Sequence, residues 1–133
     1  MSILVLILAT GIIFLIADAI MLSQVMKPLF ERHLGDSLLD GIRAGPALLF
    51  YVVYMAGVIW FAGWPALRDG APGQALLNGA ILGAVAYGTY ELTSWTVMRD
   101  WSPSMVAVDW AWGTALTAGS AWAGVVIARA LTG

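Results

Sequence analysis

The chain has 133 residues, of which 61% are hydrophobic and 11% charged, and its mean hydropathy is +0.87. This composition excludes an ordinary water-soluble domain and indicates that lipid is the solvent. Six basic and eight acidic residues give a net charge of -2 and are scattered singly, so no basic patch for nucleic acid is present. Because the chain has no cysteine, disulfides, thiolate nucleophiles and thiolate metal sites are also excluded.

The first apolar stretch predicts a membrane helix over about residues 3–25. It is not interpreted as a secretory signal, because the first basic side chain is Lys27 and a signal peptide begins with a basic region. Lys27-Pro28 is expected to end the helix, since proline disfavours helical conformation in the residue before it. Residues 27–43 then show apolar residues every four positions between charged ones, which predicts an amphipathic segment in the membrane interface.

Three further membrane helices are predicted, over about residues 45–64, 74–98 and 104–130. Trp64-Pro65 marks the expected end of the second. The tight connection 99–103 makes the third and fourth helices antiparallel neighbours. The prediction is therefore an all-α, polytopic membrane protein: one domain, 1–133, forming an antiparallel bundle of four transmembrane helices with a short interfacial segment after helix one.

Small residues on the last two helices predict that these helices pack closely. Gly79 and Gly83 are spaced four residues apart on the third helix. On the fourth helix the small residues roughly follow Asp109, at Gly113, Thr117, Ala121 and Gly124.

The basic residues predict the orientation. The connections after helices one and three lie on one side and contain Lys27, Arg32, Arg43 and Arg99, whereas the other side has Arg68 and Arg129. By the positive-inside rule, the first side faces the cytoplasm and both termini face outward.

Three acidic residues lie within the predicted spans: Asp18, Glu91 and Asp109. An aspartate at the centre of a membrane helix costs about 2.5 to 3.5 kcal/mol, so such residues usually face the bundle interior and mark a function. Each lies six or seven residues from the cytoplasmic end of its helix, which corresponds to a depth of about 10 Å. The three acids are therefore expected to share one layer.

Aromatic residues are predicted at the same depth, so a polar pocket is expected in the cytoplasmic half of the bundle. Tyr51 and Tyr54 are three residues apart and share a helix face, and Tyr87 lies one turn from Glu91. The residues predicted to bind a ligand or a proton are Asp18, Tyr51, Tyr54, Tyr87, Tyr90, Glu91, Asp109 and Trp112. The residues predicted at the cytoplasmic rim are Arg32, His33, Arg43, Arg99 and Asp100.

Purely structural roles for the three acids stay open at this point. Asp18 would then bond to a neighbouring helix, Glu91 would pair with Arg43 or Arg99, and Asp109 would accept a tryptophan indole N–H.

Neither a metal nor a cofactor is predicted, and no catalytic residue is assigned. The single histidine, His33, is expected at the solvated surface, and the chain lacks the Glu-x-x-His spacing of di-iron helical bundles. Ser/His/Asp catalysis would require His33 to reach a serine inside the membrane, such as Ser94. The sequence does not support such an arrangement.

The sequence resembles a family of small bacterial inner-membrane proteins known as domain of unknown function 2177. The resemblance implies a four-helix fold in the bacterial inner membrane and no particular activity. It differs at Met21, where the family pattern has an aromatic residue. The stretches that carry the resemblance are 18–22, 32–35, 47–51 with Tyr54, 86–93, 99–101, and Asp109 with 112–114.

The leading functional hypothesis is a membrane protein that binds or carries a small amphipathic or lipid-like ligand in this pocket. A proton-coupled exporter acting as a homodimer is the first alternative, since a buried carboxyl group can exchange a proton for a cationic substrate. An accessory subunit of a larger membrane complex and an intramembrane lipid-modifying enzyme are the others. The expected partners are membrane lipid, the ligand, and a second copy or a larger complex, but not nucleic acid.

Overall fold

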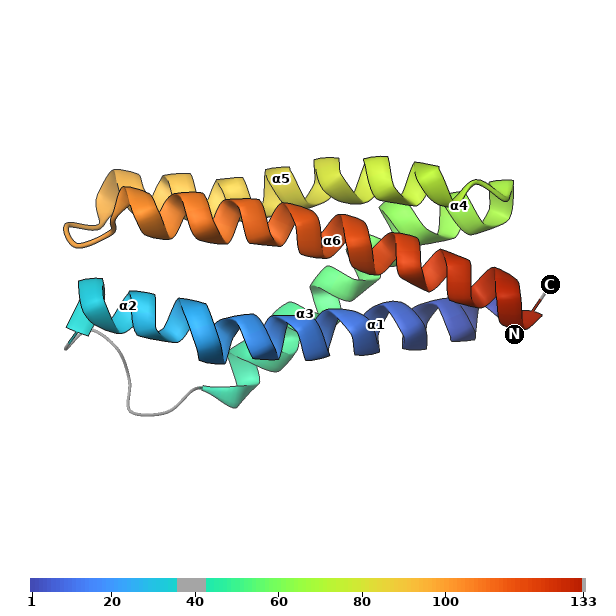
Figure 1. Cartoon of the computed structure of the whole chain (residues 1–133), viewed down its shortest axis with the longest axis horizontal. Coiled ribbons are helices and arrows are strands. Elements are labelled where there is room, and N and C mark those ends of the chain that lie inside the picture. Colours follow the sequence, from blue (N-terminus) through green and yellow to red (C-terminus); the bar gives the residue numbers. More distant parts are fainter. Residues whose placement is uncertain (36–42, 133) are drawn as a thin grey trace.

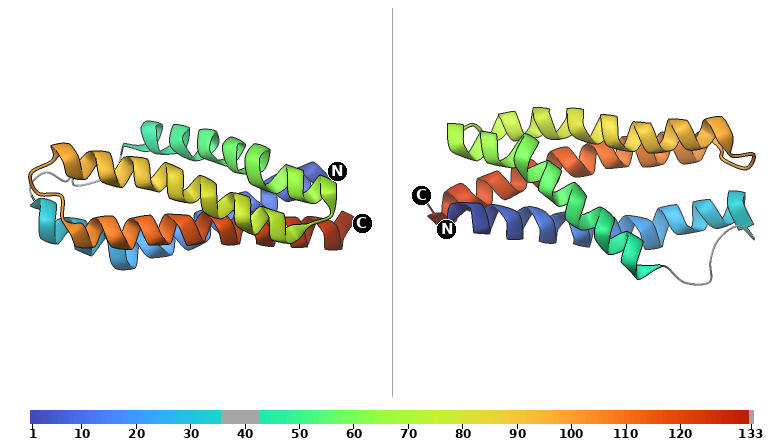
Figure 2. Two further views of the ribbon diagram at one scale, coloured as in Figure 1. Left: turned by 90° about the horizontal axis from the view of Figure 1, so that it is seen from above. Right: turned by 180° about the vertical axis from the view of Figure 1, so that it is seen from behind.

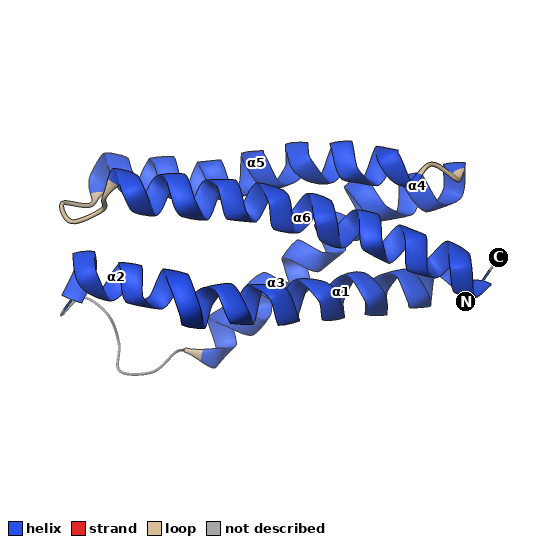
Figure 3. Cartoon of the chain, viewed as in Figure 1, coloured by secondary structure: helices blue, strands red, loops and turns tan. Residues whose placement is uncertain are grey.

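The computed structural model describes residues 1–35 and 43–132, and these are helical almost throughout, with no β-strand among them (Figures 1 and 3). The predicted all-α fold is confirmed, with four long helices. In chain order the elements are α1 (Ser2–Met21), the π-helical segment η1 (Leu22–Met26), α2 (Lys27–Leu34), α3 (Ala44–Val58), the π-helical segment η3 (Ile59–Gly63), α4 (Trp64–Asp69), α5 (Pro72–Val97) and α6 (Pro103–Thr132).

Helix one does not end at Lys27-Pro28, so that prediction is wrong. α1, η1 and α2 form one continuous helix of 33 residues from Ser2 to Leu34. In η1 the backbone N–H of Lys27 donates to the carbonyl of Leu22, five residues earlier. This wider turn accommodates Pro28, whose ring would clash with the carbonyl group four residues before it in a regular α-helix. The first part of the expected interfacial segment therefore extends helix one, and residues 36–42 lie outside the described residues.

Helix two passes through its proline in the same way. The predicted end at Trp64-Pro65 is wrong, because η3 precedes this pair and the helix continues as α4 to Asp69. The backbone then turns at Gly70, whose φ of 65° lies in the left-handed region that glycine adopts without steric cost.

Helices three and four match their predicted boundaries within two residues and form an antiparallel hairpin (Figure 2). The small residues set their separation. A Cβ added at Gly79 would lie 2.9 Å from Cα of Ala118, and one at Gly83 would lie 2.8 Å from the carbonyl oxygen of Gly113. The predicted close packing is confirmed, and α5 and α6 share the largest interface of the bundle.

Three of the helices are long and apolar enough to cross a membrane: Ser2–Leu34, Ala44–Asp69 and Pro103–Thr132. α5 is less apolar than these three helices, because its 26 residues include Asn78, Glu91 and several threonines. It runs beside α6 along its length, so it accompanies a spanning helix through the membrane. The large apolar side chains that point outward from α1, α3 and α5 face lipid, which does not penalise their exposure.

α3 leans across the other helices and does not complete a regular bundle (Figure 2). Its only buried residues are Tyr54 and Val58, and it meets α1 over a small area. The main apolar core lies instead where α1, η3 and α6 meet, around Leu6, Phe14 and Val125. Both termini lie at the same end of the molecule (Figure 1), as an even number of spans requires.

Candidate functional site

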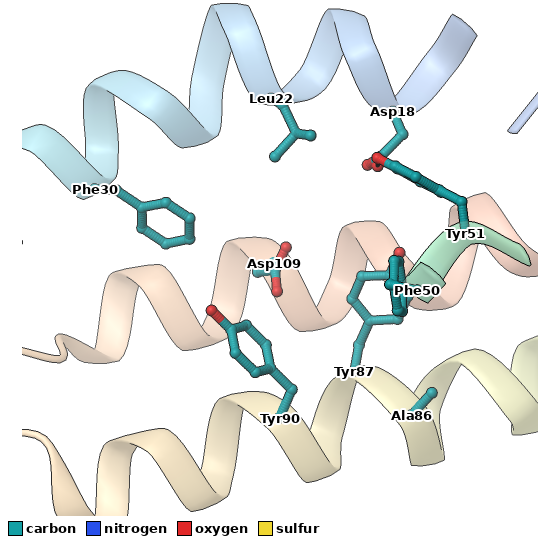
Figure 4. Close-up of a pocket in the computed structure, with 9 residues that line it drawn as sticks. All are labelled: Asp18, Leu22, Phe30, Phe50, Tyr51, Ala86, Tyr87, Tyr90 and Asp109. Carbon is teal, nitrogen blue, oxygen red and sulfur yellow. Dashed lines mark hydrogen bonds between the residues drawn. The ribbon is translucent and has the colours of Figure 1, made fainter. Parts of the chain in front are cut away.

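A cavity of about 430 Å³ opens between α1, α3, α5 and α6, in the half of the molecule away from the termini (Figure 4). Helix one contributes one wall, and the side chains of Asp18, Tyr90 and Asp109 point into the same space from three different helices. Five of the eight residues predicted for the pocket line it. The complete lining is Asp18, Leu22, Phe30, Phe50, Tyr51, Ala86, Tyr87, Tyr90 and Asp109.

Asp18 links three helices through its carboxylate. The hydroxyl group of Tyr51 on α3 donates to Oδ2 over 2.6 Å, and the indole N–H of Trp112 on α6 donates to Oδ1 over 3.4 Å. Only 7% of Asp18 is exposed. The bond from Tyr51 is short, as expected for a charge-assisted hydrogen bond. Asp18 therefore combines the two roles considered from the sequence, because it bonds to neighbouring helices and also lines the cavity.

Tyr54 and Trp112 were predicted to line the pocket, but they support it from behind. The hydroxyl group of Tyr54 bonds with that of Thr117 on α6 at 2.7 Å, and its ring packs edge-on against Tyr87 at 5.9 Å between centroids. The indole N–H of Trp112 is used by its hydrogen bond to Asp18. These two residues therefore fix the positions of lining residues.

Glu91 does not line the cavity, because it is fully buried. The indole N–H of Trp101 donates to its Oε1 over 2.9 Å, whereas its Oε2 meets no donor within the described part of the chain. Trp101 comes from the connection after α5 and folds back over the carboxyl group, with its ring edge-on to Tyr90. The alternative pairing of Glu91 with arginine is wrong for the described residues, whose one ion pair joins Arg68 and Asp69.

Asp109 presents the second carboxyl group of the cavity. It is 8% exposed, and no N–H or hydroxyl group in residues 1–35 and 43–132 donates to it. The alternative in which Asp109 accepts an indole N–H is not seen among the described residues, and the indole of the adjacent Trp110 donates to the carbonyl of Ala84. The fully buried carboxyl group of Glu91 lies next to that of Asp109. The remaining polar surface of Asp109 faces the cavity (Figure 4).

The predicted rim residues lie at this end of the molecule but outside the cavity lining. Arg32, Arg43, Arg99 and Asp100 are exposed, and His33 is half-buried with Nε2 3.4 Å from the hydroxyl oxygen of Ser104. Leu29, Phe30 and Leu34 of α2 pack against Trp101, Met105 and Val106, and this small apolar cluster closes the end of the hairpin.

The described residues hold no cluster of three or more His, Asp or Glu side chains that would suit a metal ion. The chemistry on offer in the cavity is therefore that of two carboxyl groups, three phenols and aromatic faces.

Comparison with known proteins places the chain in a family. A family model described as "Predicted membrane protein (DUF2177)" matches residues 3–126. The chain belongs to this family. The resemblance noted from the sequence is thus confirmed, and the family description specifies a membrane protein without an activity. No curated protein and no solved structure matches the chain.

The bond between Tyr51 and Asp18 is expected to contribute measurably to folding in this member of the DUF2177 family. Tyr51→Phe is expected to lower the free energy of unfolding by roughly 2 kcal/mol, because a hydrogen bond to a charged group is lost and Asp18 stays buried. Reversible unfolding by dodecyl sulfate in mixed micelles, followed by circular dichroism, measures the change. Tyr90→Phe is the matched control, since the Tyr90 hydroxyl makes no bond to the described residues. Equal losses in both variants would contradict the assigned bond.

Proposed function

We propose that the protein binds and carries a small amphipathic or lipid-like ligand in the cavity between α1, α3, α5 and α6. The observation that carries this proposal is the lining itself. Two carboxyl groups and three tyrosines converge on a space of about 430 Å³ whose other walls are apolar. A cavity of this size with few convergent polar groups has the general character of a small-molecule site.

A second hollow supports an amphipathic ligand. A groove of about 540 Å³ runs between α1 and the α3–η3 helix, and its lining is almost entirely apolar. Tyr51 lines both hollows, so the two lie next to each other at that side chain. Because the groove lies along membrane-spanning helices, its surroundings are acyl chains. A ligand with a polar end in the cavity and an apolar chain in the groove would use both.

The proposal includes the cellular setting. The protein lies in the bacterial inner membrane with its termini outside and the cavity end toward the cytoplasm, supported by the four basic residues at that end. It acts as a homodimer or within a larger membrane complex. The proton-coupled exporter is kept as a second candidate, because Glu91 is buried beside Asp109 and one of its carboxyl oxygens has no N–H or phenol donor in the part of the chain that the structure describes.

Native mass spectrometry of the protein extracted gently from its own membrane tests the ligand hypothesis. We expect a discrete bound mass on the wild-type protein that is at least about tenfold less abundant on Asp109→Asn, because one lost charge-assisted contact is worth about 1.5 to 3 kcal/mol. Asp69→Asn is the matched control, since Asp69 is half-exposed and lies at the other end of helix two.

The outcomes separate the functions. A bound mass that is retained by Asp69→Asn and lost from Asp109→Asn supports the cavity as the site. A protein partner that stays on all three forms, with no small ligand on any, would overturn the proposal in favour of the accessory-subunit alternative.

A further inference from the structure

We infer that the ligand's polar end is a cation, an amine or quaternary ammonium group carried on an apolar chain. This inference rests on the proposed function and specifies its ligand class. The observation behind it is that aromatic rings, together with two carboxyl groups, make up most of the cavity lining, whereas no lysine, arginine or histidine of residues 1–35 and 43–132 lines it. The aromatic lining residues are Phe30, Phe50, Tyr51, Tyr87 and Tyr90.

The rings surround the space from three sides. Phe30 comes from α2, Phe50 and Tyr51 from α3, and Tyr87 and Tyr90 from α5 (Figure 4). The centroids of Phe50 and Tyr51 are 5.3 Å apart and their planes are inclined by 58°, so these two rings are not stacked on each other, whereas one face of Phe50 is stacked on Tyr54 at 5.4 Å. The face of an aromatic ring carries partial negative charge and attracts a cation within about 6 Å. Several rings around one space form the kind of cage that holds quaternary ammonium groups.

Asp109 supplies the charge partner. The carboxylate of Asp18 already accepts hydrogen bonds from Tyr51 and Trp112, whereas Asp109 is more than nine-tenths buried, faces the cavity and has only the carboxyl group of Glu91 as a polar neighbour among the described residues. A carboxylate in such apolar surroundings is stabilised by an opposite charge placed beside it. A cation in the cage would provide that charge.

The same lining disfavours an anionic head group. A phosphate or carboxylate placed in the cavity would meet Asp18 and Asp109, and no basic side chain among the described lining residues would compensate its charge. The basic residues of this end, such as Arg32 and Arg99, are exposed outside the lining. The cavity therefore selects by charge sign as well as by shape.

Three amphiphiles with the same ten-carbon chain test the ligand class: decyltrimethylammonium, decanol and decyl phosphate. Their affinities for the full-length protein in maltoside micelles are measured by isothermal titration calorimetry. We expect decyltrimethylammonium to bind at least about tenfold more tightly than the other two, as cation–π and charge contacts would give. Asp109→Asn should remove most of that preference, and Asp69→Asn should keep it.

A second pair of variants tests the cage independently of the acid. Phe50→Leu should lower the affinity for decyltrimethylammonium several-fold and leave that for decanol unchanged, whereas Phe50→Tyr should keep both, because Phe50 is 46% exposed and tolerates replacement. The opposite result is that decyl phosphate binds the wild-type protein as tightly as decyltrimethylammonium or more tightly, and loses this binding in Asp109→Asn. That result would overturn the cationic class while leaving the proposed binding function intact. If none of the three amphiphiles distinguishes wild type from Asp109→Asn, both proposals fail.

Discussion

Trp101→Phe is expected to lower the free energy of unfolding by roughly 3 kcal/mol. The substitution keeps the aromatic packing against Phe30 and Tyr90 but removes the indole N–H that donates to Oε1 of Glu91. Since Oε2 has no N–H or phenol donor among the described residues, the carboxyl group would be left buried with only the carboxyl group of Asp109 beside it. Removing one partner from a buried polar pair exposes the full desolvation cost of the other.

The double variant Trp101→Phe/Glu91→Leu is the decisive comparison, because it removes both partners. It should be more stable than Trp101→Phe alone, since no polar group is then left unsatisfied. Trp95→Phe is the matched control on α5, where the side chain is 45% exposed, and it should change stability by less than about 0.5 kcal/mol. Dodecyl sulfate unfolding followed by circular dichroism measures all three. If the double variant is as unstable as Trp101→Phe, the bond between Trp101 and Glu91 does not hold the connection between α5 and α6 in place.

Gly83→Leu is expected to destabilise the protein by roughly 3 kcal/mol or more, through separation of α5 from α6. The first carbon of any side chain at this position would already lie 2.8 Å from the carbonyl oxygen of Gly113 and 2.9 Å from Cα of Thr114. These are backbone atoms of a helix and cannot move aside locally, so the two helices must part. The same unfolding assay reports the loss.

Gly119→Leu is the matched control for Gly83→Leu. Gly119 lies on α6, yet a Cβ added there would meet nothing within 4 Å. The substitution should be neutral or stabilising by about 0.5 to 1 kcal/mol, because leucine loses less conformational freedom than glycine on forming a helix. A similar loss of stability at both positions would show that glycine is needed for a reason other than the helix contact.

The layer of polar residues could be predicted from the sequence because helices have a regular rise. Counting residues from the predicted helix ends placed Asp18 and Asp109 at one depth, and both line the cavity, although the end assumed for helix one was wrong. The spacing of Gly79 and Gly83 likewise predicted the close contact between α5 and α6. Both inferences use only the geometry within single helices, which the amino-acid pattern determines directly.

The closure of the site could not be predicted, because it depends on how connections and tilts arrange the helices. Glu91 was predicted to line the pocket, but Trp101 from the following connection folds over it. Phe50 lines the cavity only because α3 leans across the bundle. Phe30 was missed because Pro28 was interpreted as the end of helix one.

The π-helical turn before Pro28 also sets the angular phase of helix one. Asp18 and Phe30 are twelve residues apart, and on an uninterrupted α-helix, at about 100° per residue, they would point in directions about 120° apart. A π-helical turn takes up about one additional residue, which removes about 100° of this offset. The carboxylate and the ring therefore face the same space. A proline that would ordinarily interrupt a helix acts here as a phase correction, and it makes one wall of the cavity out of two stretches that would otherwise diverge.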